Sequence, residues 1–133
     1  MATLFTRIIN REIPGRFVHE DDRCVAFLTI APIRPGHTLV VPRDEIDHWL
    51  DMPPDLTAHV FQTAQRVSRA LQRAFPCEKV GLMIAGLEVP HTHLHLVPID
   101  SIRDLDFAKQ NDKTPAGELD AAAEKIRAAL AAG

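Results

Sequence analysis

Three histidines stand at alternate positions of one short segment: His91, His93 and His95. Pro90 and Pro98 bracket the segment, which disfavours a helix interior and favours a β-strand. Alternate side chains of a strand share one face, so we expect the three imidazoles to line one exposed face while the residues between them pack inward. Imidazoles that only pack or pair are seldom gathered in this way, so three on one face indicate a chemical role.

Two kinds of chemistry use several imidazoles side by side. Zinc binds histidine nitrogens at about 2.0–2.1 Å, but three residues on a straight strand cannot all reach one ion. Further ligands would have to come from His37, His48 or Glu88. The alternative is attack on phosphorus, because a neutral imidazole is a good nucleophile near pH 7. Its neighbours then bind phosphate oxygens and supply a proton to the leaving group, so this chemistry explains all three histidines, whereas metal ligation explains two.

The elements that must position these histidines follow from the hydrophobic period along the chain. Apolar residues at helical spacing predict three helices, at residues 4–9, 54–75 and 119–130. Pro14-Gly15 is expected to end the first of them. Short β-prone runs between turn residues predict five strands, at residues 16–20, 24–28, 37–41, 79–85 and 91–99. Because consecutive strands are joined by short turns, we expect antiparallel meander pairing and the α+β class.

The composition is that of one small globular domain. The chain has 133 residues, of which 46% are hydrophobic, and a net charge of −3. This mild acidity argues against nucleic acid as a partner, because phosphate backbones are bound by clustered Lys and Arg. No signal peptide is visible at the N-terminus, and the longest apolar run, residues 80–87, is too short to span a bilayer. We therefore expect a cytoplasmic protein without a membrane partner, in which Cys24 and Cys77 are buried thiols.

Several runs of sequence accompany the three histidines in a recognisable order. They are residues 5–9, 13–14, 20–22, 25–28 and 35–42, followed by the alternating segment 91–97. Together they resemble the histidine triad (HIT) family of nucleotide hydrolases and transferases. The family signature is H-φ-H-φ-H-φ-φ, where φ is apolar, and Thr92 stands at one of the usually apolar places. The likeness covers residues 1–100, which we expect to form a HIT-like domain, with a C-terminal loop and helix at residues 101–133 packed on it.

The resemblance implies a fold and an assembly. Family members form a five-stranded antiparallel sheet with helices, in agreement with the element order above, and dimerise so that two sheets join into one. We therefore expect a HIT-like α+β fold with a short N-terminal helix, a long central helix and a C-terminal helix. A homodimer is expected as well, with the apolar side of the helix between Leu56 and Phe75 as its candidate contact.

The resemblance also implies a role for each residue of the site. His93 is expected to attack the α-phosphate of a purine nucleotide or a related substrate and to carry the nucleotidyl group until water removes it. His95 is expected to contact the phosphate or the leaving group, while His91 and His37 orient the set. No metal or other cofactor is implied. The expected apolar slot for the base consists of Phe5, Ile8, Phe27 and Ile30.

The chain departs from the family pattern at three places. Thr29 stands where the family has an aspartate that binds both ribose hydroxyls, which a single hydroxyl cannot do. Glu88 lies in a shortened segment before the triad, where its charge repels phosphate unless it pairs with a histidine or points away. We keep both among the expected nucleotide-binding residues. The cysteines that hold structural zinc in many relatives are Thr3 and Thr6 here, and a histidine ligand is replaced by Glu45, so structural zinc is not expected.

Three functions therefore compete. The leading hypothesis is a hydrolase or transferase that cleaves a nucleoside phosphoramidate, phosphoanhydride or phosphoester bond at the α-phosphate through His93. The second is a nucleotide-binding module with little or no turnover, which Thr29 and Glu88 favour. The third is a metal-dependent hydrolase. The other histidines, His19, His48 and His59, belong to none of these and are expected to be surface or packing residues.

Overall fold

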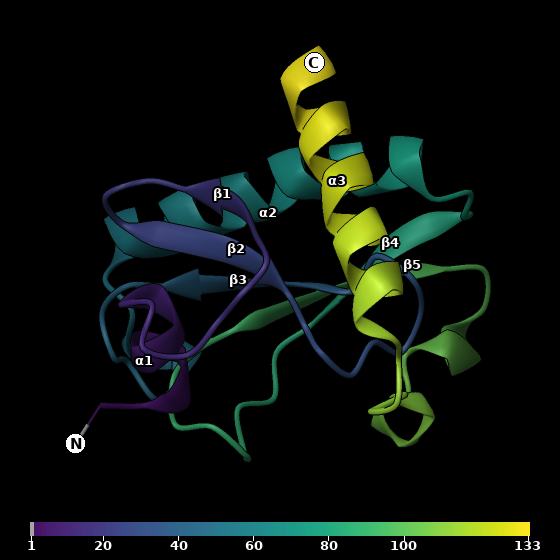
Figure 1. The fold of residues 1–133 in the computed structure, drawn as a ribbon. Coiled ribbons are helices and arrows are strands. Elements are labelled where there is room, and N and C mark those ends of the chain that lie inside the picture. Colours follow the sequence, from purple (N-terminus) through teal and green to yellow (C-terminus); the bar gives the residue numbers. More distant parts are fainter. Residues whose placement is uncertain (1) are drawn as a thin grey trace.

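Five strands form one antiparallel sheet in the computed structural model, which describes residues 2–133 (Figure 1). They are β1 (Phe17–Glu20), β2 (Cys24–Leu28), β3 (Thr38–Pro42), β4 (Lys79–Met83) and β5 (Leu94–Ile99), in the spatial order β1-β2-β3-β5-β4. The α+β class and the antiparallel sheet are confirmed. The meander prediction holds for β1–β2–β3 and for the β4–β5 pair. It is wrong at the centre of the sheet, where β3 pairs with β5, so that β4 lies at the edge.

Three α-helices pack on the sheet (Figure 1): α1 (Leu4–Ile9), α2 (Pro54–Ala74) and α3 (Ala116–Ala132). Short 3₁₀ turns also occur: η1 (Trp49–Asp51), η2 (Ile102–Asp104) and η3 (Phe107–Lys109). The expected stop of the first helix at Pro14-Gly15 is wrong. α1 ends at Ile9, and Arg11 follows with a positive φ of 62°, so the backbone leaves the helical path before the proline. In the described part of the chain, none of the helices combines the length and apolar character needed to cross a bilayer.

The two faces of the sheet carry separate apolar clusters. Ala26, Val40 and Leu96 point to the face that α2 and α3 cover. Phe27 and Leu39, their neighbours in sequence, point to the face that α1 covers. This division follows from the strand period of two, which sends successive side chains to opposite faces. The histidine segment therefore lies where one face must hold aliphatic core and the other can hold polar side chains.

The long helix does not offer the dimer contact expected from the sequence. Leu56, Val60, Val67 and Leu71 are at most 3% exposed, because this stripe faces the sheet within a single chain. α3 packs against the same helix and places Ile126 in the same cluster at 0% exposure. The apolar period thus marks the core of the monomer, and a partner would have to bind elsewhere.

Candidate active site

The three histidines of the alternating segment are buried at the start of β5. The expected strand over residues 91–99 begins only at Leu94, because Thr92 turns to the loop after β3: its backbone N–H and its hydroxyl both donate to the Ile46 carbonyl at 2.7 Å. The expectation of an exposed face is also wrong, since the exposed fraction of His91, His93 and His95 is 0–7%. The rings of His93 and His95 still lie side by side, with centroids 4.8 Å apart.

His93 is held in one tautomer by a backbone carbonyl. Its Nδ1 lies 2.7 Å from the carbonyl oxygen of His91, and because a carbonyl only accepts, the proton is on Nδ1. The other nitrogen, Nε2, is therefore an unprotonated lone pair. The ring packs edge-to-face on Phe5, at a centroid distance of 4.7 Å, so both its position and its tautomer are defined. This is the arrangement that a nucleophilic imidazole requires.

His91, whose carbonyl accepts the His93 hydrogen bond, is itself fixed by two hydrogen bonds of its ring. Its Nε2 donates to the carbonyl of Pro42, and its Nδ1 accepts from the hydroxyl of Thr3, both at 2.7 Å. The hydroxyl of Thr3 in turn accepts the N–H of Thr6 at the start of α1. His91 is thus saturated with hydrogen bonds and acts on His93 through its own backbone carbonyl.

A second chain of hydrogen bonds defines the tautomer of His95. The backbone N–H of Ile33 donates to His37 Nδ1 at 3.0 Å, so the proton of a neutral His37 is on Nε2. His37 Nε2 lies 3.0 Å from His95 Nδ1 and donates to it, which leaves the proton of His95 on Nε2. Gly36, with φ +93°, makes the turn that brings His37 to this place, and a Cβ there would meet the Phe75 ring at 2.8 Å.

Burial keeps these histidines neutral. It is the largest cause that lowers the pKa of all four, to about 4 for His37 and about 3 for His95. Neighbouring imidazoles act in the same direction, since His93 lowers the pKa of His37, and both lower that of His95. Hydrogen bonding to the His91 carbonyl and the charge of Glu88 oppose the fall for His93. At neutral pH the cluster therefore presents one lone pair, on His93, and one N–H donor, on His95.

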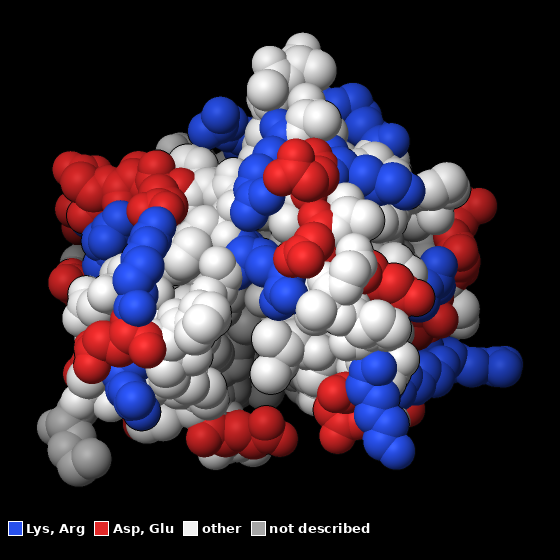
Figure 2. Space-filling view, viewed as in Figure 1, with Lys and Arg blue, Asp and Glu red and all other residues white. Residues whose placement is uncertain are grey.

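A pocket of about 350 Å³ opens beside these two residues. Its walls include His93 and His95 and all six residues expected around a nucleotide: Phe5, Ile8, Phe27, Thr29, Ile30 and Glu88. His91 and His37 do not line it. Figure 2 shows the face that carries α1 and α3 hollowed between these two parts, with mostly uncharged surface beside the hollow. The volume and the apolar walls are typical of a site for one small organic ligand.

Phe107 and Gln110 complete the pocket, and the sequence reasoning missed both. They come from η3 and the residue after it, in a segment whose polar composition predicts a loop. The Phe107 ring lies 4.9 Å from that of His95, and the Gln110 amide donates to the Ala31 carbonyl at 3.1 Å. An aromatic residue isolated in a polar loop was the one signal, but a loop's position depends on contacts distant in sequence.

Thr29 and Glu88, the two pocket residues that depart from the family pattern, both have side-chain groups available to a ligand. Thr29 is half-buried, and its hydroxyl accepts the N–H of Ala31 at 3.2 Å, so one lone pair and one proton are left for a ligand. Glu88 is exposed, forms no ion pair within residues 2–133, and lies close enough to His93 for its charge to raise that pKa. A phosphate at His93 would therefore meet a negative potential from Glu88.

The residues at the family's structural zinc position do not fit zinc. Hydrogen bonds join Thr3 to both Glu45 and Thr6: Glu45 Oε1 accepts the Thr3 N–H at 2.7 Å, and the Thr3 and Thr6 hydroxyl oxygens lie 3.2 Å apart. His91 uses its Nδ1 for the Thr3 hydroxyl. Zinc in proteins binds thiolate, imidazole and carboxylate, and two neutral hydroxyls are outside that donor set. Here hydrogen bonds tie α1 to the histidine segment.

The fold and the site together define a class: small α+β proteins in which a buried histidine cluster closes one end of an apolar pocket. The family model of the HIT domain matches residues 10–102. A HIT-like protein of Borreliella burgdorferi is 38% identical over 102 residues, which are 71% of this chain and 73% of the relative. The chain belongs to the HIT family, so the resemblance inferred from the sequence is confirmed.

Solved structures and a plant relative agree with this assignment. A hypothetical histidine triad nucleotide-binding protein of Sulfolobus tokodaii has a TM-score of 0.85 at 27% identity, covering 96% of this chain and 91% of its own. A zinc-bound histidine triad family protein of Mycobacterium smegmatis has a TM-score of 0.84 at 28% identity, covering 99% and 95%. Adenylylsulfatase HINT3 of Arabidopsis thaliana is 27% identical over 128 residues, which are 92% of this chain and 64% of the relative.

Proposed function

We propose that the protein is a hydrolase or transferase that cleaves a nucleotide at its α-phosphate through a covalent intermediate on His93. One observation carries the proposal: the hydrogen bond from His93 Nδ1 to the His91 carbonyl, which leaves Nε2 unprotonated on a residue that lines the pocket. A lone pair in this position can attack phosphorus without first losing a proton. Membership of a family that contains a plant adenylylsulfatase supports the same class of reaction.

The proposed reaction has two steps at one phosphorus atom. His93 Nε2 forms a bond to phosphorus while the bond to the leaving group breaks with its electron pair, and the leaving group takes one proton from solvent. Nδ1–H stays on His93, so the ring of the intermediate is a cation that the His91 carbonyl stabilises. Water then attacks phosphorus, the electron pair of the N–P bond returns to Nε2, and the proton that the water loses goes to solvent, which balances the one that the leaving group took.

His95 supplies the electrostatic support for both steps. Its Nε2–H points away from His37 and is available to an oxygen of the phosphate or to the leaving group. Phe5, Ile8 and Phe27 offer an apolar slot for a purine base next to it. Phe107 closes the slot over His95. A purine nucleotide fits this combination of an apolar slot and a neutral donor–nucleophile pair.

The test is hydrolysis of adenosine 5′-phosphoramidate, followed by chromatography, with the parent, His93→Asn and His48→Asn. His48 is an exposed histidine that caps η1 through its ring nitrogen, a bond that asparagine can keep, so it is the matched control. The parent and His48→Asn should turn over alike, while His93→Asn should lose about a thousandfold or more. Acid quenching should trap the parent, but not His93→Asn, with one nucleotidyl group by mass spectrometry. Equal rates in parent and His93→Asn would overturn the proposal.

A nucleotide-binding module is the second candidate, and the position of Glu88 at the pocket favours it, because its charge opposes phosphate. Calorimetry with AMP separates the two. Tight binding by a parent that gives no product from a panel of phosphoramidates and dinucleoside polyphosphates would establish the module. A metal-dependent hydrolase would lose its activity to EDTA, which the His93 mechanism does not predict.

We propose further that the protein forms a homodimer through the edge of its sheet. β4 pairs only with β5 among the described strands, which leaves its other backbone edge open, and Leu82 on it is exposed. Strand addition at this edge would join two sheets into one. Light scattering should give twice the monomer mass, and Leu82→Lys, which places a charge at an exposed position of β4, should shift the mass to that of a monomer if this edge carries the contact.

A further inference from the structure

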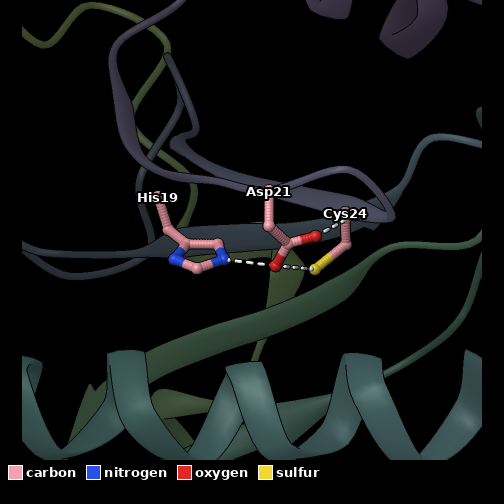
Figure 3. Close-up of side chains that lie close together, drawn as sticks. All are labelled: His19, Asp21 and Cys24. Carbon is pink, nitrogen blue, oxygen red and sulfur yellow. Dashed lines mark hydrogen bonds and ion pairs between the residues drawn. The ribbon is translucent and has the colours of Figure 1, made fainter.

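Three side chains that belong to no part of the histidine pocket meet at the turn between β1 and β2. His19 lies in β1, Asp21 lies in the turn, and Cys24 begins β2. Their ligand atoms, one imidazole nitrogen, one carboxylate oxygen and one sulfur, all lie within 4.8 Å of one another. Figure 3 shows the three side chains directed toward one another above α2. These are the three ligand types that zinc binds in proteins.

A fourth group of a suitable type contacts this cluster from α2. His59 Nε2 lies 2.9 Å from Asp21 Oδ2, and His19 Nε2 lies 2.7 Å from the same oxygen. Cys24 Sγ is 3.6 Å from it. Two imidazole nitrogens and one sulfur thus converge on one carboxylate oxygen. The ligand atoms of His19, Asp21 and Cys24 are mutually close, and a turn of the His59 side chain would bring its nitrogen to an ion held by those three. Four ligands of this composition suit a tetrahedral site for a divalent transition metal.

The surroundings hold these groups in place. The second carboxylate oxygen of Asp21 accepts the backbone N–H groups of Arg23 and Cys24, both at 2.8 Å, which fixes the carboxylate plane. Burial acts to raise the pKa of Asp21, but hydrogen bonds from both histidines and from the backbone outweigh it and hold that pKa below its usual range. Cys24 is fully buried, and its sulfur also approaches the Thr63 hydroxyl at 3.5 Å. Such supporting contacts are typical of ordered metal ligands.

Charged groups near the cluster act on a bound cation in both directions. One carboxylate and one thiolate would neutralise a dication. Arg43 opposes it, because its Nε donates to the Asp21 carbonyl at 2.7 Å, although its other end lies 3.8 Å from Glu20. Burial raises the pKa of the Cys24 thiol to about 11, so a bound metal must displace the thiol proton. A metal that bonds sulfur strongly, such as Zn²⁺ or Co²⁺, is therefore the fitting occupant, and Mg²⁺ or Ca²⁺ is not.

We propose that His19, Asp21, Cys24 and His59 form a structural site for a zinc-like divalent metal that ties the β1–β2 turn to α2. Cys24 belongs to the cluster on the α2 face of the sheet, whereas Phe5, which packs on His93, belongs to the α1 face. The metal therefore takes no part in the chemistry of the pocket. The metal links the β1–β2 turn to α2, which are otherwise joined at this place by hydrogen bonds of the same side chains.

The test is titration of chelator-treated, reduced protein with Co²⁺, whose bond to a thiolate gives a charge-transfer band in the near ultraviolet. The parent should develop this band, together with the visible bands of tetrahedral cobalt, and reach saturation at one equivalent. The chain has two cysteines, so Cys24→Ser and Cys77→Ser form a matched pair. Cys24→Ser should lose the band, and Cys77→Ser should keep it. His93→Asn should keep it as well, because the site is independent of the pocket.

A milder variant guards against misfolding of Cys24→Ser. His59 is on the partly exposed side of α2, so His59→Gln should fold while its Co²⁺ dissociation constant rises at least tenfold. Zn²⁺ should raise the melting temperature of the parent more than that of His59→Gln. Absence of the band at equimolar Co²⁺, its persistence in Cys24→Ser, or equal affinity of parent and His59→Gln would each overturn the proposal and leave these residues as a hydrogen-bonded cluster.

Discussion

His37 Nε2 lies 3.0 Å from His95 Nδ1, in a contact between residues 58 positions apart. Because the Ile33 N–H occupies the other nitrogen of His37, the direction of this hydrogen bond is determined, and the proton of His95 is directed away from His37. A residue that does not line the pocket thereby decides which nitrogen of His95, a residue that does line it, carries the proton. His37 is a positioning residue in this sense.

Replacement of His37 by asparagine should separate turnover from binding. The asparagine oxygen can still accept the Ile33 N–H, but its side chain is too short to reach His95, whose two tautomers then become available. We expect kcat to fall roughly 10- to 100-fold, which corresponds to the loss of one buried hydrogen bond at about 1.4–2.7 kcal/mol, with a smaller change in KM. Steady-state kinetics on a phosphoramidate measures both. A rise in KM at constant kcat would contradict a positioning role.

Thr29→Asp should tighten nucleotide binding. A carboxylate can accept hydrogen bonds from two ribose hydroxyls, whereas the Thr29 hydroxyl already accepts the Ala31 N–H. We expect AMP to bind about tenfold more tightly, in keeping with one hydrogen bond to a charged group. Calorimetry with AMP and with 2′-deoxy-AMP measures the change. Thr29→Asn is the uncharged control, and an equal gain for 2′-deoxy-AMP would show that the ribose hydroxyls are not the cause.

Glu88→Gln should lower KM for a phosphate-bearing substrate. Glu88 lines the pocket and has no ion-pair partner in the described chain, so its charge acts on any anion near His93. Removal of the charge should lower KM about threefold to tenfold at low salt, and the difference should shrink as salt screens it. Glu124→Gln, on the exposed side of α3, is the control and should leave KM unchanged. An increase in KM for Glu88→Gln would indicate a direct contact with substrate instead.

The free energy of unfolding should decrease as the pH is lowered from 6.5 toward 4. The pKa values of His37 and His95 lie below the ordinary 6.5, at about 4 and about 3, so the unfolded chain binds more protons than the folded one between those values and 6.5. The free energy of unfolding therefore falls as pH falls from 6.5 toward 4, by roughly 1.4 kcal/mol per pH unit for each histidine that stays neutral.

Urea unfolding at pH 7 and pH 4.5 measures this dependence. His37→Asn should show a smaller loss between the two, because one of the groups responsible is absent. The Asp21 pKa is lowered, so its contribution is lost only below its unfolded value of 3.8 and does not enter this window. Identical losses in the parent and His37→Asn would contradict the assignment of the effect to the buried pair.

The local sequence predicted the features of the fold that depend on the spacing of apolar residues along a strand or a helix. The alternation from Val25 to Leu28 sets which side chains face α1 and which face α2, and this period needs no distant contact. The helical stripe from Leu56 to Leu71 predicted the long helix for the same reason. The alternation of His91, His93 and His95 likewise favours the prediction of attack on phosphorus over metal ligation without reference to any other part of the chain. Each of those features depends on the spacing of residues that lie at most four positions apart in the sequence.

The tertiary structure determined the contacts between residues that are distant in the sequence. It paired β3 with β5 instead of β4, buried the histidines that the sequence placed on an exposed face, and brought Phe107 to His95. It also joined His59 to Asp21, two residues that the sequence assigned to the surface or left without a partner. No local period encodes such contacts, because each depends on how helices and strands pack against a shared core. The sequence by itself therefore named the proposed nucleophile, and the packing of the whole chain decided its tautomer, its neighbours and its pKa.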